Sequence, residues 1–124
     1  MLWNSKKSSG STRNTGGDWE QFAEHYLIKQ GLAPLEKNFH SRHGEVDLIM
    51  QDQQSLVFIE VKYRKNQHFG GAIHAVSNTK QQKLIKTAQF FLHQRGLNEY
   101  NTCCRFDVVA IEGNTNPPNI TWLK

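Results

Sequence analysis

The spacing of apolar residues predicts two amphipathic helices. The first extends from Asp18, a residue type that favours the N-cap position, to Gly31. Its apolar stripe consists of Trp19, Phe22, Ala23, Tyr26 and Leu27. The second begins near Asn78 or Thr79, each followed three residues later by glutamine, and ends at Gly96. Its stripe consists of Leu84, Ile85, Ala88, Phe91 and Leu92.

Shorter apolar runs predict strands over residues 35–40, 45–50, 56–63, 105–111 and 120–123. In the second run the alternation assigns Val46, Leu48 and Met50 to one face and Glu45, Asp47 and Ile49 to the other. The third run is apolar on both faces at its start and is therefore expected to be central. Because strands on either side of a crossover helix usually pair in parallel, the order predicts a mixed sheet.

Length and composition indicate one globular domain. The chain has 124 residues, of which 37% are hydrophobic and 21% charged. Residues 1–17 lack apolar periodicity and are expected to form a disordered basic tail before a single domain over residues 18–124. No apolar run approaches the roughly 18 residues of a membrane span, and the adjacent Cys103 and Cys104 suit no disulfide framework or zinc site. We therefore expect a cytoplasmic protein without membrane contact.

Charge is divided into blocks along the sequence. The net charge of +4 combines an acidic block over residues 18–60 with a block over residues 61–98 that contains seven basic residues and no acidic one. Two solvated faces would give this pattern. A phosphate-binding surface beside a carboxylate cluster would give it equally well.

Ionisable residues inside the predicted strands are the candidates for chemistry, because a strand packed on a core rarely tolerates charge. We favour a hairpin in which Leu48 faces Ile59; a slip of one residue would send the ionisable residues of the two strands to opposite faces. Directly opposed residues point to the same face. In that register the opposed pairs are Asp47 with Glu60 and Glu45 with Lys62. Three carboxylates and an ammonium group would then converge on one patch.

Two close carboxylates suit Mg²⁺ (or Mn²⁺), which takes oxygen ligands and keeps several waters for a phosphate substrate. Asp47 and Glu60 would hold the ion, and Lys62 could orient the attacking water or stabilise charge on the phosphate. A cross-strand ladder of salt bridges, Glu45 with Lys62 beside a solvated pair of carboxylates, is the alternative.

Several short motifs taken together resemble the YraN-like family, related to the restriction-endonuclease-like PD-(D/E)XK nucleases. They are Gly44-Glu45-Val46-Asp47-Leu48-Ile49, Phe58-Ile59-Glu60-Val61-Lys62-Tyr63-Arg64, Phe69-Gly70, Lys80 and Arg105-Phe106-Asp107-Val108-Val109. The resemblance implies an α/β fold with a restriction-endonuclease-like αβββαβ core, a mixed sheet flanked by two helices. It also implies that Asp47 binds the metal and that Glu60 and Lys62 are the acid and lysine of the motif. Val46 stands where the superfamily motif has proline.

Archaeal Holliday-junction resolvases of that superfamily also carry a glutamate on the first helix. Glu20 fits this place, although an ordinary first-turn acid stabilised by the helix dipole is nearly as good an interpretation. Apart from Val46, which replaces the proline of the superfamily motif, the residues match the pattern. The resemblance therefore implies a catalytic set of Asp47, Glu60 and Lys62, assisted by Glu45 and Glu20.

The sequence therefore predicts a metal-dependent nuclease for nucleic acid, with structured or branched DNA preferred over RNA. The alternative is a nucleic-acid-binding module that has the nuclease fold and cleaves little. Candidate phosphate-binding residues are Arg64, Lys65, Lys80, Gln81 and Lys83. The sequence leaves the oligomeric state open, with a homodimer among the alternatives.

Overall fold

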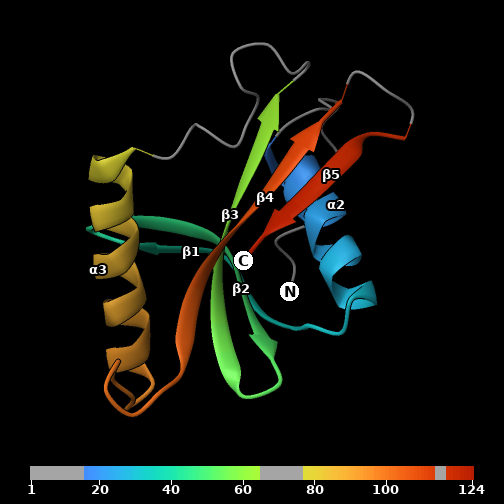
Figure 1. The fold of residues 1–124 in the computed structure, drawn as a ribbon. Helices are drawn as coiled ribbons and strands as arrows, with labels where there is room; N and C mark the ends of the chain where they lie inside the picture. Colours follow the sequence, from blue (N-terminus) through green and yellow to red (C-terminus); the bar gives the residue numbers. More distant parts are fainter. Residues whose placement is uncertain (1–15, 65–76, 114–116) are drawn as a thin grey trace.

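Helix, three strands, helix and two strands follow one another along the chain, as the hydrophobic pattern predicts. The computed structural model describes residues 16–64, 77–113 and 117–124 (Figure 1). The elements are α2 (Gly16–Lys29), β1 (Ala33–Ser41), β2 (Gly44–Asp52), β3 (Ser55–Arg64), α3 (Asn78–Gln94), β4 (Cys104–Glu112) and β5 (Asn119–Leu123). Helix α2 begins two residues before Asp18. Asp18 lies in the first turn, where its negative charge interacts favourably with the helix dipole. Residues 1–15 of the predicted tail lie outside the described residues, and its last two residues, Gly16 and Gly17, belong to α2, so the predicted boundary at Asp18 was two residues late.

In the described part of the chain the strands form one five-stranded sheet in the order β1-β2-β3-β4-β5. Strands β3 and β4 pair in parallel and the other neighbours are antiparallel, so the sheet is mixed. Helices α2 and α3 cover opposite faces (Figure 1). The predicted α/β fold with an αβββαβ core is confirmed, and β5 extends the sheet at its edge.

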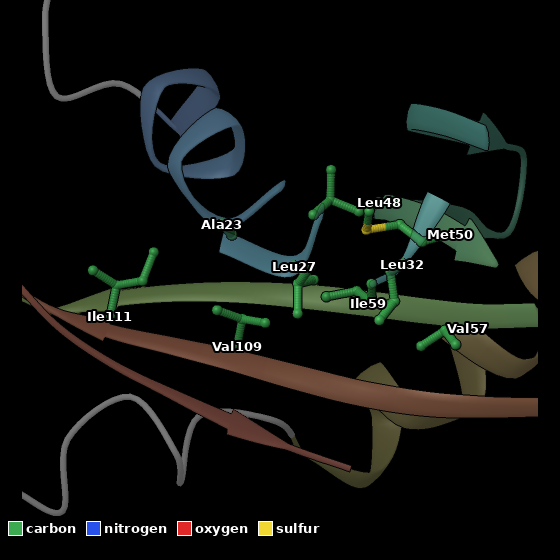
Figure 2. Close-up of a cluster of buried hydrophobic side chains, with 9 residues drawn as sticks. All are labelled: Ala23, Leu27, Leu32, Leu48, Met50, Val57, Ile59, Val109 and Ile111. Atoms are coloured by element: carbon green, nitrogen blue, oxygen red, sulfur yellow. The ribbon is translucent and has the colours of Figure 1, made fainter. Parts of the chain in front are cut away.

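A hydrophobic core lies on each face of the sheet. Figure 2 shows the core under α2, formed by Ala23, Leu27, Leu32, Leu48, Met50, Val57, Ile59, Val109 and Ile111. The core under α3 is formed by Val46, Ile49, Leu56, Phe58, Leu84, Ala88, Phe91 and Leu92. Burying one such side chain stabilises the fold by about 1.5–3 kcal/mol. The sheet is therefore held from both sides, which explains why β3 is apolar on both faces.

Helix α3 differs from its prediction at two points. The helix begins at Asn78, as predicted, but its N-cap is the preceding residue, Ser77, whose hydroxyl accepts a hydrogen bond from the Lys80 backbone N–H at 3.2 Å. The buried stripe contains Thr87 where Ile85 was predicted, and Ile85 is exposed. Thr87 is tolerated there because its hydroxyl donates to the backbone carbonyl of Lys83 at 2.8 Å.

Strand β2 changes face between Val46 and Leu48. Leu48 packs in the core under α2, whereas Val46 packs with Ile49 in the core under α3. Regular alternation would place Val46 with Leu48, so this part of the predicted pattern was wrong. The chain turns over at Asp47, the residue between them.

Strand β1 turns over at the facing position. Lys37 forms an ion pair with Glu24 of α2 at 2.8 Å, whereas Phe39 packs under α3. Asn38 lies between them and has φ +50°. A left-handed residue inside a strand reverses the side on which the following side chain emerges, which is why the two neighbours contact different helices.

At the end of the sheet away from the β3 carboxyl terminus, a buried carboxylate is fully bonded. Asp107, 1% exposed, accepts hydrogen bonds from Arg105 Nε at 3.0 and 3.2 Å and from Trp122 Nε1 at 2.9 Å. Arg105 also binds Asp52 at 2.8 Å. This network joins β4 to β5 and to the β2–β3 turn. Within the described ranges, neither helix is long and apolar enough to cross a membrane.

Candidate active site

The candidate site lies where β2 and β3 separate. The predicted register is confirmed, because Leu48 faces Ile59, and the pairing of β2 with β3 ends at these two residues. Beyond this point β2 continues beside β1 and β3 continues beside β4. The Val61 backbone N–H has left the β2 ladder and donates to Asp47 Oδ2 at 2.8 Å. A carboxylate thus replaces the backbone of β2 as the partner of β3.

Three carboxyl groups from three elements meet at this gap. Asp47 of β2 is 7% exposed and Glu60 of β3 is 5% exposed. Glu20, near the start of α2, shares a side-chain hydrogen bond with Asp47. The structure therefore brings together three of the four acids that the motifs indicated, and Glu20 does not point to solvent as an ordinary acid near a helix start would.

Two lysines bind the Glu60 carboxylate. Lys62 Nζ lies 3.3 Å and Lys80 Nζ lies 2.7 Å from the same atom, Glu60 Oε2. The hydrogen bond to Glu60 raises the pKa of Lys80. Lys62 follows Glu60 on β3, as predicted, whereas Lys80 comes from the first turn of α3. The site therefore combines three acids with two ammonium groups.

Aromatic packing fixes the first turn of α2 over the site. Trp19, the neighbour of Glu20, stacks on Tyr63, the neighbour of Lys62, with ring centroids 4.2 Å apart and an interplanar angle of 13°. Both helices begin at the end of the sheet where β3 and β4 terminate (Figure 1). Their first turns therefore reach the gap from opposite faces.

Burial and repulsion raise the proton affinity of two of the acids. Burial, followed by the charge and hydrogen bond of Asp47, raises the pKa of Glu20 from 4.5 to about 8. Burial and the charge of Glu60 raise the pKa of Asp47 from 3.8 to about 6, against the opposing effect of the Val61 N–H. A site that disfavours its own negative charges in this way favours protons or cations between them.

This arrangement predicts that the metal-free protein loses stability as the pH rises. The folded state holds protons on Glu20 and Asp47 that the unfolded chain releases, so their contribution is complete below about pH 4 and is lost as the pH rises through about 6 and then 8. Melting curves in a chelator from about pH 5 to pH 9 measure the effect. Glu20→Gln, which mimics the protonated carboxyl, should remove most of the loss between about pH 7 and 9. A parent protein equally stable across this range contradicts the prediction.

Glu45 lies at the rim and not in the centre of the cluster. Its half-exposed carboxylate binds His40 Nδ1 of β1 at 3.1 Å, so the predicted contact with Lys62 was wrong. The reason is that β2 follows β1 beyond Leu48, which carries Glu45 away from β3. Its charge still contributes to raising the pKa values of Glu20 and Asp47.

The candidate phosphate-binding residues separate into two groups. Lys80 lies inside the carboxylate cluster. Gln81 and Lys83 are exposed on α3, and Arg64 is exposed at the end of β3. Lys65 lies outside the described residues. Gln81 and Lys83 therefore lie along the first turns of α3, and Arg64 lies at the carboxyl end of β3.

Sequence reasoning missed one member of the cluster. The Asn38 side chain of β1 forms a hydrogen bond with Glu20. Asparagine in the middle of a predicted strand was the available signal, since asparagine is depleted in strands and tolerates left-handed backbone.

The donor set suits a divalent cation only in part. In the portions of the chain that the structure describes, no three His, Cys, Asp or Glu side chains are grouped as a metal site. Asp47 and Glu60 would therefore supply two carboxylates, with water or phosphate oxygens completing the shell. Mg²⁺ is commonly held in this way, by one or two carboxylates together with waters and substrate phosphates. Two buried carboxylates, Asp47 and Glu60, fit such an ion, although they do not complete its coordination shell.

The chain matches the model of the uncharacterised protein family UPF0102 over residues 19–111. It is 57% identical over 126 residues to a UPF0102 protein of Colwellia psychrerythraea, covering 100% of this chain and 98% of the relative. It is 47% identical to UPF0102 proteins of Nitrosococcus oceani, with 90% of each chain covered, and of Vibrio vulnificus, with 91% of each covered. The matched region runs from Trp19 in α2 to Ile111 in β4 and contains every residue of the site. The protein belongs to the UPF0102 family, the YraN-like family that the motifs resemble.

Proposed function

We propose that this protein is a metal-dependent phosphodiesterase that cleaves nucleic acid, with structured or branched DNA as its substrate class. The observation that supports this most is the pair of buried carboxylates, Asp47 and Glu60, beside Lys62 at the carboxyl end of β3. Burial and the charge of Glu60 raise the pKa of Asp47, so the ionised Asp47 is costly to the fold, and such groups cluster at functional sites. The preference for structured DNA comes from the resemblance to resolvases.

Asp47 and Glu60 would hold Mg²⁺ or Mn²⁺. When bound, such an ion polarises the phosphoryl oxygen and lowers the pKa of a coordinated water. Both residues lie on strands packed between two cores, so their backbones are held in fixed positions. The Val61 N–H fixes one Asp47 oxygen at 2.8 Å, which sets the orientation of the carboxylate.

The chain's own groups supply charge and orientation. The Lys62 ammonium, 15% exposed and 3.3 Å from Glu60, is placed to stabilise negative charge that develops on a phosphate at this carboxylate. Glu20 holds the Asp47 carboxyl by a hydrogen bond from the α2 side. The basic residues exposed on α3 would bind neighbouring phosphates of the nucleic acid.

One observation favours a binding module instead. Lys80 Nζ already lies 2.7 Å from Glu60 Oε2, so an ammonium group neutralises the carboxylate that a metal would use. In that alternative, Lys62 and Lys80 bind phosphates and no bond is cleaved. The intact set of two carboxylates and a lysine makes the enzyme the better proposal.

The test is cleavage of a labelled panel of duplex, branched and single-stranded DNA and of RNA, with Mg²⁺ or Mn²⁺ and with a chelator. We expect metal-dependent cleavage of branched DNA. The double variant Asp47→Asn, Glu60→Gln, purified in parallel, excludes a contaminating nuclease. Tight binding without cleavage under any condition would establish the binding module, and neither binding nor cleavage would refute both.

Salt dependence should distinguish the two kinds of lysine on α3. Each lysine that neutralises a phosphate of duplex DNA contributes about −0.9 to the slope of log affinity against log salt. Lys83→Gln should therefore flatten the slope by about 0.9. Lys80→Gln should flatten it less, because its ammonium is committed to Glu60. Fluorescence anisotropy over a series of salt concentrations measures both slopes. Equal changes would place Lys80 on the phosphate-binding surface.

A further inference from the structure

The left-handed residue Asn38 faces the candidate metal ligand Asp47 across the β1–β2 ladder. The pairs Lys37–Leu48 and Phe39–Val46 enclose them on either side. Asn38 has φ +50°, a conformation that is disfavoured for residues with a Cβ atom and best tolerated by asparagine, aspartate and glycine.

Its position inside a strand makes this conformation unusual. Among the described residues, the other residue besides glycine with positive φ is Gln53, at φ +59°. Gln53 belongs to the turn that joins β2 to β3, where such a conformation is ordinary. Strand pairing does not require a residue with positive φ, and backbone strain of this kind is found most often at functional sites.

The conformation has a direct effect on Asp47. Regular alternation would place Asp47 on the α3 face with Ile49, away from α2. In the structure both strands turn over at this point. Lys37 and Leu48 face α2, whereas the neighbouring pair of the ladder, Phe39 and Val46, packs under α3. The Asp47 carboxyl consequently shares a hydrogen bond with Glu20 of α2.

The Asn38 side chain completes the arrangement. It forms a hydrogen bond with Glu20, and Glu20 forms one with Asp47. Three residues from β1, α2 and β2 are thus linked in a row, and the row ends at the Val61 N–H of β3, 2.8 Å from Asp47. Asn38 therefore acts on the site through both its backbone and its side chain.

We propose that Asn38 is a positioning residue of this site. Its left-handed backbone turns Asp47 toward α2, and its side-chain amide holds Glu20 against Asp47. The consequence for cleavage rests on the proposed function; the consequence for the arrangement of Asp47 does not.

Hydrogen exchange of the Val61 amide in the metal-free protein tests the backbone effect, because this amide reports where Asp47 lies. Glycine adopts positive φ without strain, so Asn38→Gly should leave Val61 exchange within about threefold of the parent. Asn38→Ala disfavours the positive φ at this position. It should therefore speed exchange of the Val61 amide about tenfold, relative to amides in the β2–β3 ladder. The control is Gln53→Ala, which also places alanine at a positive φ, but in the β2–β3 turn. It should leave exchange of the Val61 amide unchanged. Val61 exchange in Asn38→Ala equal to that of the parent would overturn the inference.

A double-mutant cycle on melting temperature tests the side chain. Asn38→Gly and Glu20→Ala each remove one end of the same hydrogen bond, so their combined shift should be smaller than the sum of the single shifts. Fully additive shifts would overturn this part of the inference. In cleavage assays, Asn38→Gly should lower the single-turnover rate about tenfold with unchanged affinity for DNA. If the parent cleaves nothing, the proposed function fails, and the exchange and melting results still decide the role of Asn38.

Discussion

Replacing Asp47 with asparagine should abolish metal-dependent cleavage while the metal-free protein stays as stable as the parent or gains slightly. Burial and the charge of Glu60 disfavour the ionised Asp47, so a neutral side chain relieves repulsion. The asparagine oxygen can still accept the Val61 N–H. Loss of the carboxylate removes a metal ligand, and cleavage should fall about a hundredfold or more. Single-turnover cleavage and melting in a chelator measure the two effects.

Glu60→Gln should also abolish cleavage, but its effect on stability should have the opposite sign. Glu60 neutralises both Lys62, 15% exposed, and Lys80, 40% exposed. An amide in its place leaves two ammonium groups together without a counter-charge, which should cost about 2 kcal/mol. Equal stability of the two variants would show that the lysines do not depend on Glu60.

Asp107→Asn is the matched control, because Asp107 is equally buried and lies outside the candidate site. It should destabilise the fold by about 3 kcal/mol, since it breaks the buried pair with Arg105. The folded fraction should cleave at the parental rate. A loss of cleavage in this variant at low temperature would mean that the assay reports stability and not chemistry.

Lys62→Ala should lower the single-turnover rate about a hundredfold while the affinity for DNA changes little. Its ammonium stabilises charge that develops only in the transition state, and one phosphate contact among several is minor for binding. Lys62→Arg should recover little activity, because a planar guanidinium does not fit the place of a compact, nearly buried ammonium. Affinity and single-turnover cleavage are measured for both variants.

Lys80 supplies the matched comparison, since its ammonium binds the same Glu60 oxygen but is 40% exposed. Lys80→Arg has room at the surface and should retain most of the cleavage. If the arginine variants at both positions behave like the parent, Lys62 is a phosphate contact and not a catalytic residue.

The hydrophobic pattern predicted the order of the elements. The favoured pairing of Leu48 with Ile59, which the structure confirms, brings Asp47 and Glu60 to the same point, whereas a slip of one residue would have sent them to opposite faces. Glu20 was predicted from the resemblance to resolvases, which carry a glutamate on the first helix. These residues depend on local spacing and on one hairpin, which sequence patterns describe well.

Other parts of the site depend on how distant elements pack. Lys80 reaches Glu60 because α3 starts at Ser77 and lies against the sheet, and no periodicity encodes that contact. The turning over of β1 and β2 at Asn38 and Asp47 breaks the alternation on which the face assignment relied. The predicted Glu45–Lys62 contact failed for the same reason, since β2 leaves β3 where the turn-over begins.

The irregularity of β1 also bears on aggregation. In the described sheet β1 is an edge strand, and an even edge with unpaired N–H and C=O groups is a template for pairing with another chain. β1 contains Pro34, a register shift between Pro34 and Glu36, and the left-handed Asn38. Proline offers no N–H, and bulged or turned residues interrupt the row of hydrogen-bonding groups. The backbone that shapes the carboxylate cluster therefore also disfavours growth of the sheet into intermolecular β-structure along this edge.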